Sequence, residues 1–343
     1  MLDSHALRLK KFMPSNIETP RIDLRNMIRK LPLSRSLWRW MFSKRTAYLH
    51  HRAARRQAKT MEAAALKQML LAVLPAEEQA QWRHRIESVC TDPNNVNIPR
   101  HARAGRVLGK YLVMHNGLRI HPMSHYGNLM FQMLVSNRGV HEPEEERAFS
   151  QVLKLLPTRP VMLELGSYWA FYSMWFLQAC PTGRTFLIEP DQENLEWGRR
   201  NYQANRLAGN FSNAFVGHTP ESPPDGIPTV SVDGFCKCHD IERIHMLHSD
   251  IQGAEHEMLI GAQELLRTRR IDFVFVSTHS NRLHYSCVDF LESMEYVILR
   301  NTDLNATTSY DGLIVACTRT IDEATAIREM LSFSQIGDRL AAE

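Results

Sequence analysis

The pattern of hydrophobic and polar positions changes along the chain from a helical period to an alternation of strands and helices. Apolar residues recur three and four apart from Leu24 to Leu31, and Thr60–Leu74 is rich in strong helix formers and ends at a proline. From Val161 onward, short apolar runs alternate with helical stretches. We predict strands at Val161–Leu165, Thr185–Glu189, Phe211–Val216, Ile244–His248, Ile271–Ser277, Tyr296–Arg300 and Gly312–Cys317, and helices at Tyr168–Ala179, Asp191–Leu207, Gly253–Arg267 and Leu283–Met294.

This alternation predicts an α/β fold with a doubly wound, Rossmann-like sheet of seven strands, preceded by a helical N-terminal extension. The last two strands are joined only by a loop, which predicts an antiparallel hairpin at a sheet edge. Upstream, Asn116-Gly117 between two short apolar runs predicts a further hairpin, and the acidic segment His141–Glu146 predicts a helix start. We therefore divide the chain into an extension (1–95), a hairpin and helix (96–160), the Rossmann-like domain (161–320) and a C-terminal helix or tail (321–343).

Charge is unevenly distributed along the chain. The first sixty residues hold fifteen Lys and Arg against three acidic residues, whereas the whole chain has a net charge of only +4. A basic segment of this kind can contact RNA, an anionic membrane or an acidic partner. We favour a solvated, Arg-rich helical extension, because few aromatic residues and no nucleic-acid motif accompany the charge.

Composition narrows the class of protein further. A hydrophobic share of 44% and a charged share of 23% are typical of a folded globular chain. No apolar run is long enough for a membrane helix, and no apolar segment with a cleavage site follows the start of the chain, so we expect a cytoplasmic protein. The six cysteines are scattered, and the cluster Cys236-Lys-Cys238-His239 lacks a second ligand pair, so we expect neither a disulfide framework nor a metal site.

The segment from Val161 to Ala170 is an apolar strand followed by a glycine turn and a helix. Gly166 lets the backbone approach a cofactor closely, and the carboxylate of Glu164 near the strand end can bond the amino group of a methionine moiety. The next strand ends at Glu189, about 20 residues after the turn, where nucleotide-binding folds use a carboxylate to bind ribose hydroxyls. A structural role for Glu189 at the following helix start stays open.

A third strand end carries Asp250, in the segment His248–Glu255 that opens a helix. The combination of ELGSYWAFYS, IEPDQENL and SDIQGAEHEMLIGAQELL resembles the FkbM family of S-adenosylmethionine-dependent methyltransferases. Further similarity lies in Val230–Asp233, Asn116-Gly117 and His141–Pro143, and the resemblance covers about Leu112 to Thr318. It implies the cofactor S-adenosyl-L-methionine and methyl transfer to a hydroxyl of a small molecule, sugar or glycan.

The resemblance also implies roles for single residues. Glu164, Gly166 and Ser167 would hold the methionine end of the cofactor, Glu189 the ribose, and the turn Phe215–His218, with Val216 and Gly217, the adenine; Asp250 would lie at the methyl-transfer site. The sequence departs from the family pattern at Tyr168 and Ala170, which stand where Asn and Gly are usual. We expect Tyr168 to stack on the cofactor or cover it.

Methyl transfer to a hydroxyl needs an aligned acceptor and a group that removes a proton. Asp250 is a candidate base, and it is equally suited to cap the following helix. His279, just past the next strand, is the second candidate. Upstream, His121, His125 and Tyr126 are candidates for a lid over the pocket, and His284 and Tyr285 for its lining, although packing of the helix end explains the latter two as well.

Three other functions compete with this prediction. The basic extension would suit a nucleic-acid methyltransferase, but the strand that ends at Asp250 is not followed by the Asn/Asp-Pro-Pro-aromatic segment of enzymes that methylate amino groups of nucleic acids. A cofactor-binding scaffold without turnover is supported by Tyr168 and Ala170. A nicotinamide dehydrogenase is disfavoured because the first turn lacks the three spaced glycines that a pyrophosphate needs.

Overall fold

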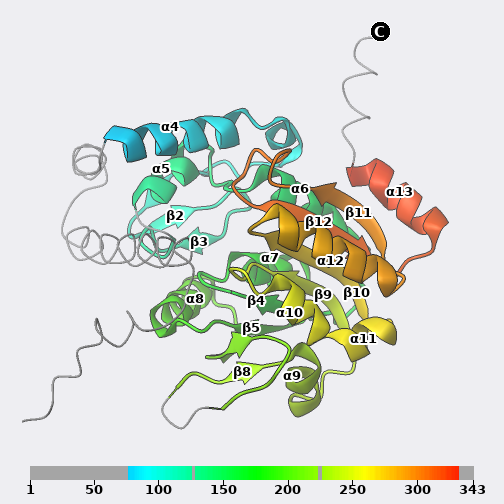
Figure 1. Ribbon diagram of the computed structural model, residues 1–343. Helices are drawn as coiled ribbons and strands as arrows, with labels where there is room; N and C mark the ends of the chain where they lie inside the picture. The colour runs from blue at the N-terminus through cyan, green and yellow to red at the C-terminus, as the bar shows by residue number, and fades with distance from the viewer. Residues whose placement is uncertain (1–75, 126–127, 223–225, 332–343) are drawn as a thin grey trace, which may run out of the picture. The chain divides into compact units, whose positions relative to one another are not determined.

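A seven-stranded mixed sheet forms the centre of the chain in a computed structural model that describes residues 76–125, 128–222 and 226–331 (Figure 1). The strand order is β11-β12-β10-β9-β4-β5-β6. The strands are β4 (Val161–Leu165), β5 (Arg184–Ile188), β6 (Asn210–Ser212), β9 (Ile244–Ser249), β10 (Ile271–Thr278), β11 (Val297–Thr302) and β12 (Gly312–Cys317). β12 runs antiparallel to both of its neighbours, and the other pairings in the sheet are parallel. The predicted doubly wound sheet with an antiparallel last hairpin is confirmed.

The direction of winding reverses at β4. The chain passes from β4 outward to β5 and β6 and then returns to β9 on the other side of β4. Open α/β sheets bind ligands outside the carboxyl ends of the strands at such a reversal, because the two flanking connections leave the sheet in opposite directions there. The loops after β4, β5, β9 and β10 meet at this edge.

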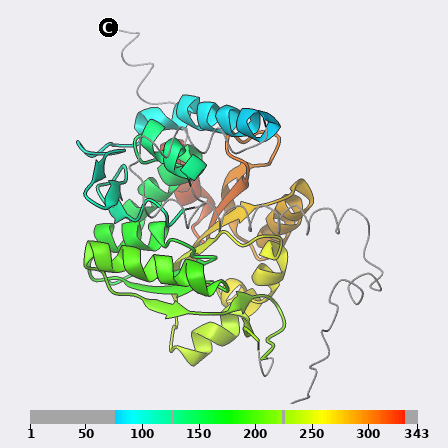
Figure 2. The same ribbon diagram turned by 90° about the vertical axis from the view of Figure 1, so that its left-hand side faces the viewer.

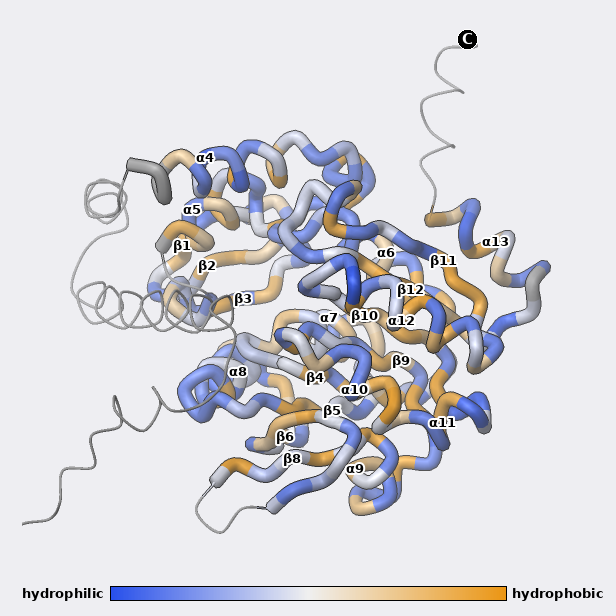
Figure 3. Tube along the Cα trace, viewed as in Figure 1, coloured by the Kyte–Doolittle hydropathy of each residue, from blue (hydrophilic) through white to orange (hydrophobic). Residues whose placement is uncertain are grey.

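Helices cover both faces of the sheet, and Figure 3 shows the hydrophobic colour following the central strands. The helices are α7 (Phe171–Ala179), α8 (Gln192–Asn205), α9 (Val232–Cys238), α10 (Glu255–Ile260), α11 (Gln263–Arg267), α12 (Asn281–Ser293) and α13 (Ile321–Leu331). Side chains alternate along β4: Met162 joins the core cluster on the α7 face, whereas Leu163 and Leu165 join the cluster on the α10 and α12 face.

Residues 76–155 form the elements before the sheet: α4 (Ala76–Thr91), the 3-10 turns η1 (Pro93–Asn97) and η2 (Leu153–Leu155), strands β1 (Val107–Leu108), β2 (Tyr111–Val113) and β3 (Arg119–Ile120), and helices α5 (Asn128–Ser136) and α6 (Pro143–Val152). The predicted hairpin around Gly117 is present, with β1 as an additional strand. The backbone N–H groups of Arg119 and His121 donate to Asn205 and Asn201 of α8, so the hairpin is fastened to the domain. The predicted helix Thr60–Leu74 lies outside the described residues.

Two predicted elements are wrong in extent. The strand predicted at Phe211–Val216 is divided, because β6 ends at Ser212 and β7 (Phe215–Val216) pairs instead with β8 (Thr229–Val230). Between them the Asn213 amide donates to the carbonyls of Glu189 and Pro190, which turns the chain away from the sheet. The helix predicted at Gly253–Arg267 breaks between α10 and α11 at Gly261, where a Cβ would lie 2.4 Å from the carbonyl oxygen of Gly217.

Candidate functional site

The ends of β4, β5 and β9 contact one another directly. The N–H groups of Gly166 and Ser167 both donate to the carbonyl of Ile188 at the end of β5, and the N–H of Asp250 donates to the carbonyl of Leu165 at the end of β4. Gly166 has φ +71°, and a Cβ there would lie 2.0 Å from the Asp250 carbonyl oxygen. Only glycine therefore permits this approach, and three separately predicted strand ends form one structure.

The turn after β4 places Tyr168 and Ala170 in the left-handed region, with φ of +42° and +61°. This conformation is favourable for Asn and Gly and costly for other residues. Tyr168 and Ala170 therefore adopt the backbone conformation that Asn and Gly prefer at these positions. Because neither is Asn or Gly, the turn is less favourable in conformational energy. It also explains why α7 begins at Phe171 and not at Tyr168.

Glu189 binds the turn through its side chain. One carboxylate oxygen accepts the N–H of Tyr168 at 3.0 Å, and the other accepts the N–H of Asp191 at 2.9 Å. Burial raises the pKa of Glu189 to about 7, against the opposing effect of the two backbone hydrogen bonds. An ionised carboxylate has about four acceptor positions, so these donors, together with the Asn194 side chain, do not occupy all of them.

Glu164 and Ser167 are both buried. The Glu164 carboxylate faces α7 and accepts the N–H of Ser173 at 3.3 Å, and burial raises its pKa to about 7. The Ser167 hydroxyl is buried and has no hydrogen-bond partner among the residues the structure describes. Of the predicted cofactor residues, these two are the least exposed to an approaching ligand.

Val216 and Gly217 lie outside the hydrogen-bonded turn of β4. They belong to the small β7–β8 pair, where the N–H of Gly217 donates to the carbonyl of Val230 at 3.0 Å. Asn213 links this segment to the end of β5 through its bonds to the carbonyls of Glu189 and Pro190.

The two predicted catalytic residues are in contact. Nε2 of His279 lies 3.4 Å from the Asp250 carboxylate and 3.4 Å from the Asp311 carboxylate, and Nδ1 lies 2.5 Å from Glu255. Burial opposes the protonated form, but the hydrogen bonds to Asp250 and Glu255 and the negative charges around the ring raise the pKa of His279 to about 10. His279 is thus an imidazolium near neutral pH. Asp250 does not cap the next helix, since the residue before α10 is Ala254.

The segment His141–Glu146 has a role that its sequence did not reveal. The acidic residues expected to begin a helix do so at α6, but they turn inward: Glu145 bonds Nε2 of His248 at 2.8 Å and the hydroxyl of Ser277 at 3.1 Å. Glu146 bonds His141 and lies 3.1 Å from His115. Four glutamates among five residues cannot all face water on one helical turn, and this is the signal that could have indicated the network.

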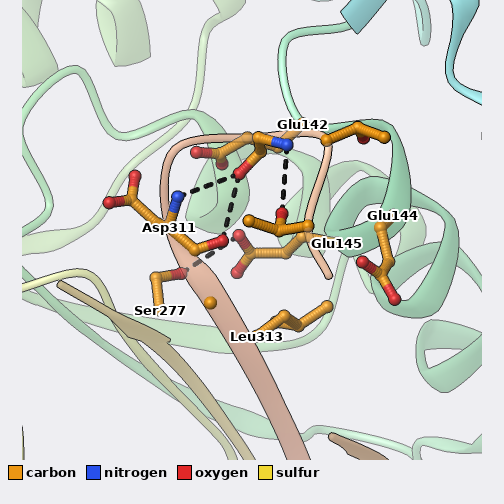
Figure 4. A pocket seen from close by; sticks show the side chains of 10 residues that line it. Glu142, Glu144, Glu145, Ser277, Asp311 and Leu313 are labelled. Atoms are coloured by element: carbon orange, nitrogen blue, oxygen red, sulfur yellow. Dashed lines mark hydrogen bonds between the residues drawn. The ribbon is translucent and has the colours of Figure 1, made fainter. Parts of the chain in front are cut away.

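A small pocket beside Asp311, with a cavity volume of about 10 Å³, opens on the α6 face of the sheet (Figure 4). Its wall contains four carboxylates and four hydroxyl side chains and neither Lys nor Arg: Glu142, Glu144, Glu145, Ser277, Thr307, Thr308, Ser309, Asp311, Gly312 and Leu313. Figure 4 shows the Glu145 carboxylate directed at the Ser277 hydroxyl, with Glu144 and Asp311 on opposite sides of them. Glu144 is held by Arg300 and Thr302. The cavity is rich in groups that accept hydrogen bonds from hydroxyls.

Other predicted site residues are more distant or have structural contacts. Tyr285 is exposed and donates to Asp303, and His284 is buried between Thr278 and Asn301. His125 stacks on Trp169 at 4.1 Å between ring centroids. Tyr126 lies outside the described residues. Within the described residues, no group of three His, Cys, Asp or Glu side chains is arranged to hold a metal ion, and no helix could cross a membrane.

Several solved structures are similar to about half of this chain. Solved structures that share similarity include precorrin-6y C5,15-methyltransferase from Geobacter metallireducens GS-15 (17% identity, 51% of this chain and 88% of that chain, TM-score 0.35). Others are TrmK from M. capricolum with S-adenosyl-homocysteine (14%, 52% and 73%, TM-score 0.33) and an rRNA methylase from Streptococcus thermophilus (10%, 50% and 95%, TM-score 0.36). No curated protein matches the sequence.

Residues 210–301 match the model of the methyltransferase FkbM domain. The matched segment runs from β6 into β11 and contains Asp250, Glu255 and His279. The part of the chain from β6 into β11 is therefore similar to the methyltransferase FkbM domain.

Proposed function

We propose that the protein transfers the methyl group of S-adenosyl-L-methionine to a hydroxyl of a small polyhydroxylated acceptor such as a sugar or glycan. The observation that carries the proposal is the chemistry of the small pocket lined by Glu142, Glu145, Ser277 and Asp311, which adjoins the Asp250–His279 contact through Asp311. Carboxylates and hydroxyls accept hydrogen bonds from sugar hydroxyls.

The residues at the strand ends fit the cofactor. Glu189 has acceptor positions left for ribose hydroxyls, and the unpartnered hydroxyl of Ser167 is a buried donor near the turn. A nearby positive charge would favour the ionised forms of Glu164 and Glu189, whose pKa values burial holds at about 7. Val216 and Gly217 are proposed at the adenine, and the bound cofactor supplies an electrophilic methyl group.

The chain's own task is then to orient the acceptor and remove its proton. His279 is protonated near neutral pH and has a carboxylate at each ring nitrogen, so it has no free lone pair. The proton acceptor is therefore a carboxylate beside it, Asp250 or Asp311. His279 holds these two carboxylates in place.

A nucleic-acid acceptor is less well supported. The cavity wall has no cation to contact phosphate, and the basic residues of the first sixty lie outside the described part of the chain. The only observation that favours a cofactor-binding scaffold without catalytic turnover is the strained turn at Tyr168 and Ala170.

The test is calorimetry with S-adenosylmethionine, followed by transfer of a labelled methyl group to separate glycan, small-molecule and RNA fractions of a cell extract. We expect binding and label in a hydroxyl-bearing product of the first two fractions. Label in RNA alone would replace the proposed acceptor, and binding without any labelled product would favour the scaffold.

A further inference from the structure

Asp311 lies at the site because β12 is antiparallel to both neighbouring strands. It ends the loop between β11 and β12, and the next residue, Gly312, pairs with Thr278 at the carboxyl end of β10. The antiparallel register therefore places Asp311 beside His279, which follows Thr278. Residues at the end of β10 and the start of β12 thus share one edge of the sheet.

His279 is fixed on both sides. Glu255, whose side chain is 0% exposed, contacts Nδ1, and this leaves Nε2 directed at the carboxylates of Asp250 and Asp311. A ring with a carboxylate at each nitrogen carries both protons and cannot accept a third. His279 is a fixed positive charge in contact with three carboxylates, so it cannot itself take the proton of the acceptor.

Of these two carboxylates, Asp311 is the one that lines the cavity. Asp250 lies on the cofactor side, because its backbone bonds the end of β4 and contacts Gly166. The charged groups around Asp311 come from four elements: Asp250 after β9, His279 after β10, Glu142 before α6 and Arg85 of α4. Burial and the negative charge of Asp250 raise the pKa of Asp311 to about 7, and His279 and Arg85 oppose this.

Segments before the sheet hold the loop that carries Asp311. The Thr308 hydroxyl donates to the Asp92 carboxylate before η1, and the Arg85 guanidinium lies 4.4 Å from the centroid of the Tyr310 ring. Both views place α4, in cyan, beside this orange loop (Figures 1 and 2). Asp311 is therefore supported from two sides, by His279 and by the α4–η1 segment.

We propose that Asp311 is the catalytic base that takes the proton of the acceptor hydroxyl, with His279 and Glu255 as positioning residues. The inference rests on the proposed function. The proton moves from the hydroxyl to the Asp311 carboxylate, and the oxygen lone pair forms the new bond to the methyl carbon. The carbon–sulfur bond breaks with its electrons going to sulfur, which becomes a neutral thioether, and Asp311 then releases its proton to water.

The kinetic test compares Asp311→Asn with Glu144→Gln, which alters a carboxylate of the same cavity that Arg300 and Thr302 hold. The probes are methyl α-glucopyranoside and myo-inositol, with labelled S-adenosylmethionine. We expect the wild-type rate to rise with pH through about 7, and Asp311→Asn to lose roughly 10²- to 10⁴-fold in rate together with that rise. Glu144→Gln removes a charge from the same pocket, so its absolute rate is not the readout; its rate should still rise with pH through about 7.

Calorimetry with S-adenosylmethionine and a thermal melt show whether Asp311→Asn is folded. A folded Asp311→Asn enzyme that keeps the wild-type rate and pH profile would overturn the proposal. If the wild type methylates neither probe, carbon-13 NMR of protein labelled at the Asp carboxyl carbon decides. A signal that is absent from Asp311→Asn and titrates near pH 7 supports the base, and one that titrates near the ordinary value of about 3.9 overturns it. Failure of the proposed function would instead appear as methylation of RNA alone.

Discussion

The backbone N–H of Tyr168 donates to the carboxylate of Glu189 across 3.0 Å, joining the turn after β4 to the end of β5. Both partners are buried, and Tyr168 holds a left-handed conformation there. The carboxylate proposed to bind the ribose is therefore also the group that stabilises a strained turn. Cofactor affinity and the geometry of the turn should change together.

Substitution Glu189→Gln is expected to weaken binding of S-adenosylmethionine by about 10- to 100-fold, since a hydrogen bond to a charged group contributes about 1.5–3 kcal/mol. Glutamine offers one acceptor oxygen where the carboxylate serves two N–H donors. Calorimetry measures the affinity. The control is Glu196→Gln on the exposed side of α8, where only a surface pair with Arg200 is lost. Equal affinity in both variants would contradict a ribose-binding role.

Alanine substitutions at Gly166 and Gly253 distinguish the cost of backbone strain from the cost of a steric collision, because both glycines have positive φ but only Gly166 has atoms close to a new Cβ. Gly166→Ala should cost more than about 3 kcal/mol of unfolding free energy, because the new Cβ adds a collision with Asp250 to the backbone strain. Gly253→Ala at φ +91° has open space around its Cβ and should cost only about 1–2 kcal/mol. Chemical denaturation gives both values. A similar loss in the two variants would mean that the β4–β9 contact is easily displaced.

His141 predicts how stability changes with pH. Burial opposes its charged form, but Glu142 at 3.0 Å and Glu146 at 2.6 Å raise its pKa to about 10. A pKa above the unfolded value of about 6.5 gives a contribution that is complete below pH 6.5 and is lost as pH rises toward 10. The melting temperature should therefore fall by roughly several degrees between pH 7 and pH 10.

The variant His141→Gln should be less stable at pH 7 and show a shallower fall toward pH 10. His279, whose pKa is also about 10, retains part of the slope. His218→Gln, at an exposed position, serves as the histidine control and should leave the profile unchanged. An unaltered slope in His141→Gln would show that the ring is neutral in the folded protein.

The bond from Thr308 to Asp92 predicts a local effect. Thr308→Val keeps the shape of the side chain but leaves the Asp92 carboxylate without its hydroxyl partner, at a cost of about 1–3 kcal/mol. Hydrogen exchange should increase in the loop 303–311, and the KM of the acceptor should rise while the affinity for S-adenosylmethionine is unchanged. Thr268→Val, at the opposite edge of the sheet, is the control. Unchanged exchange in the loop would exclude α4–η1 as its support.

Local pattern was sufficient to predict the sheet. The strand at Gly312–Cys317 has the predicted bounds, because a buried strand is a short apolar run. The division of Phe211–Val216 could not be predicted, since it depends on hydrogen bonds from Asn213 to carbonyls 23 and 24 residues away. The break at Gly261 likewise depends on a contact with Gly217.

The candidate site was only partly visible for the same reason. Asp250 and His279 each follow a strand that the pattern reveals, so their common edge could be inferred. Asp311 precedes a strand, and such a residue lies at the carboxyl edge only when the strand is antiparallel. Glu145 comes from a helix more than a hundred residues before its partner His248. The cluster of glutamates at 142–146 indicates that some of them turn inward, but no local pattern shows that Glu145 meets His248 or that Asp311 meets His279.

The reversed direction of β12 also bears on how acceptor preference can diverge. The loop from Asp303 to Asp311 supplies Thr307, Thr308, Ser309 and Asp311 to the wall of the pocket and enters none of the ladders of the sheet. Its length and composition can therefore change without breaking strand pairing, and the residues proposed to bind the cofactor, such as Glu164 on β4 and Glu189 after β5, are unaffected. Relatives with the same sheet could differ in acceptor through this single connection, and exchanging it between them is a direct route to altered specificity.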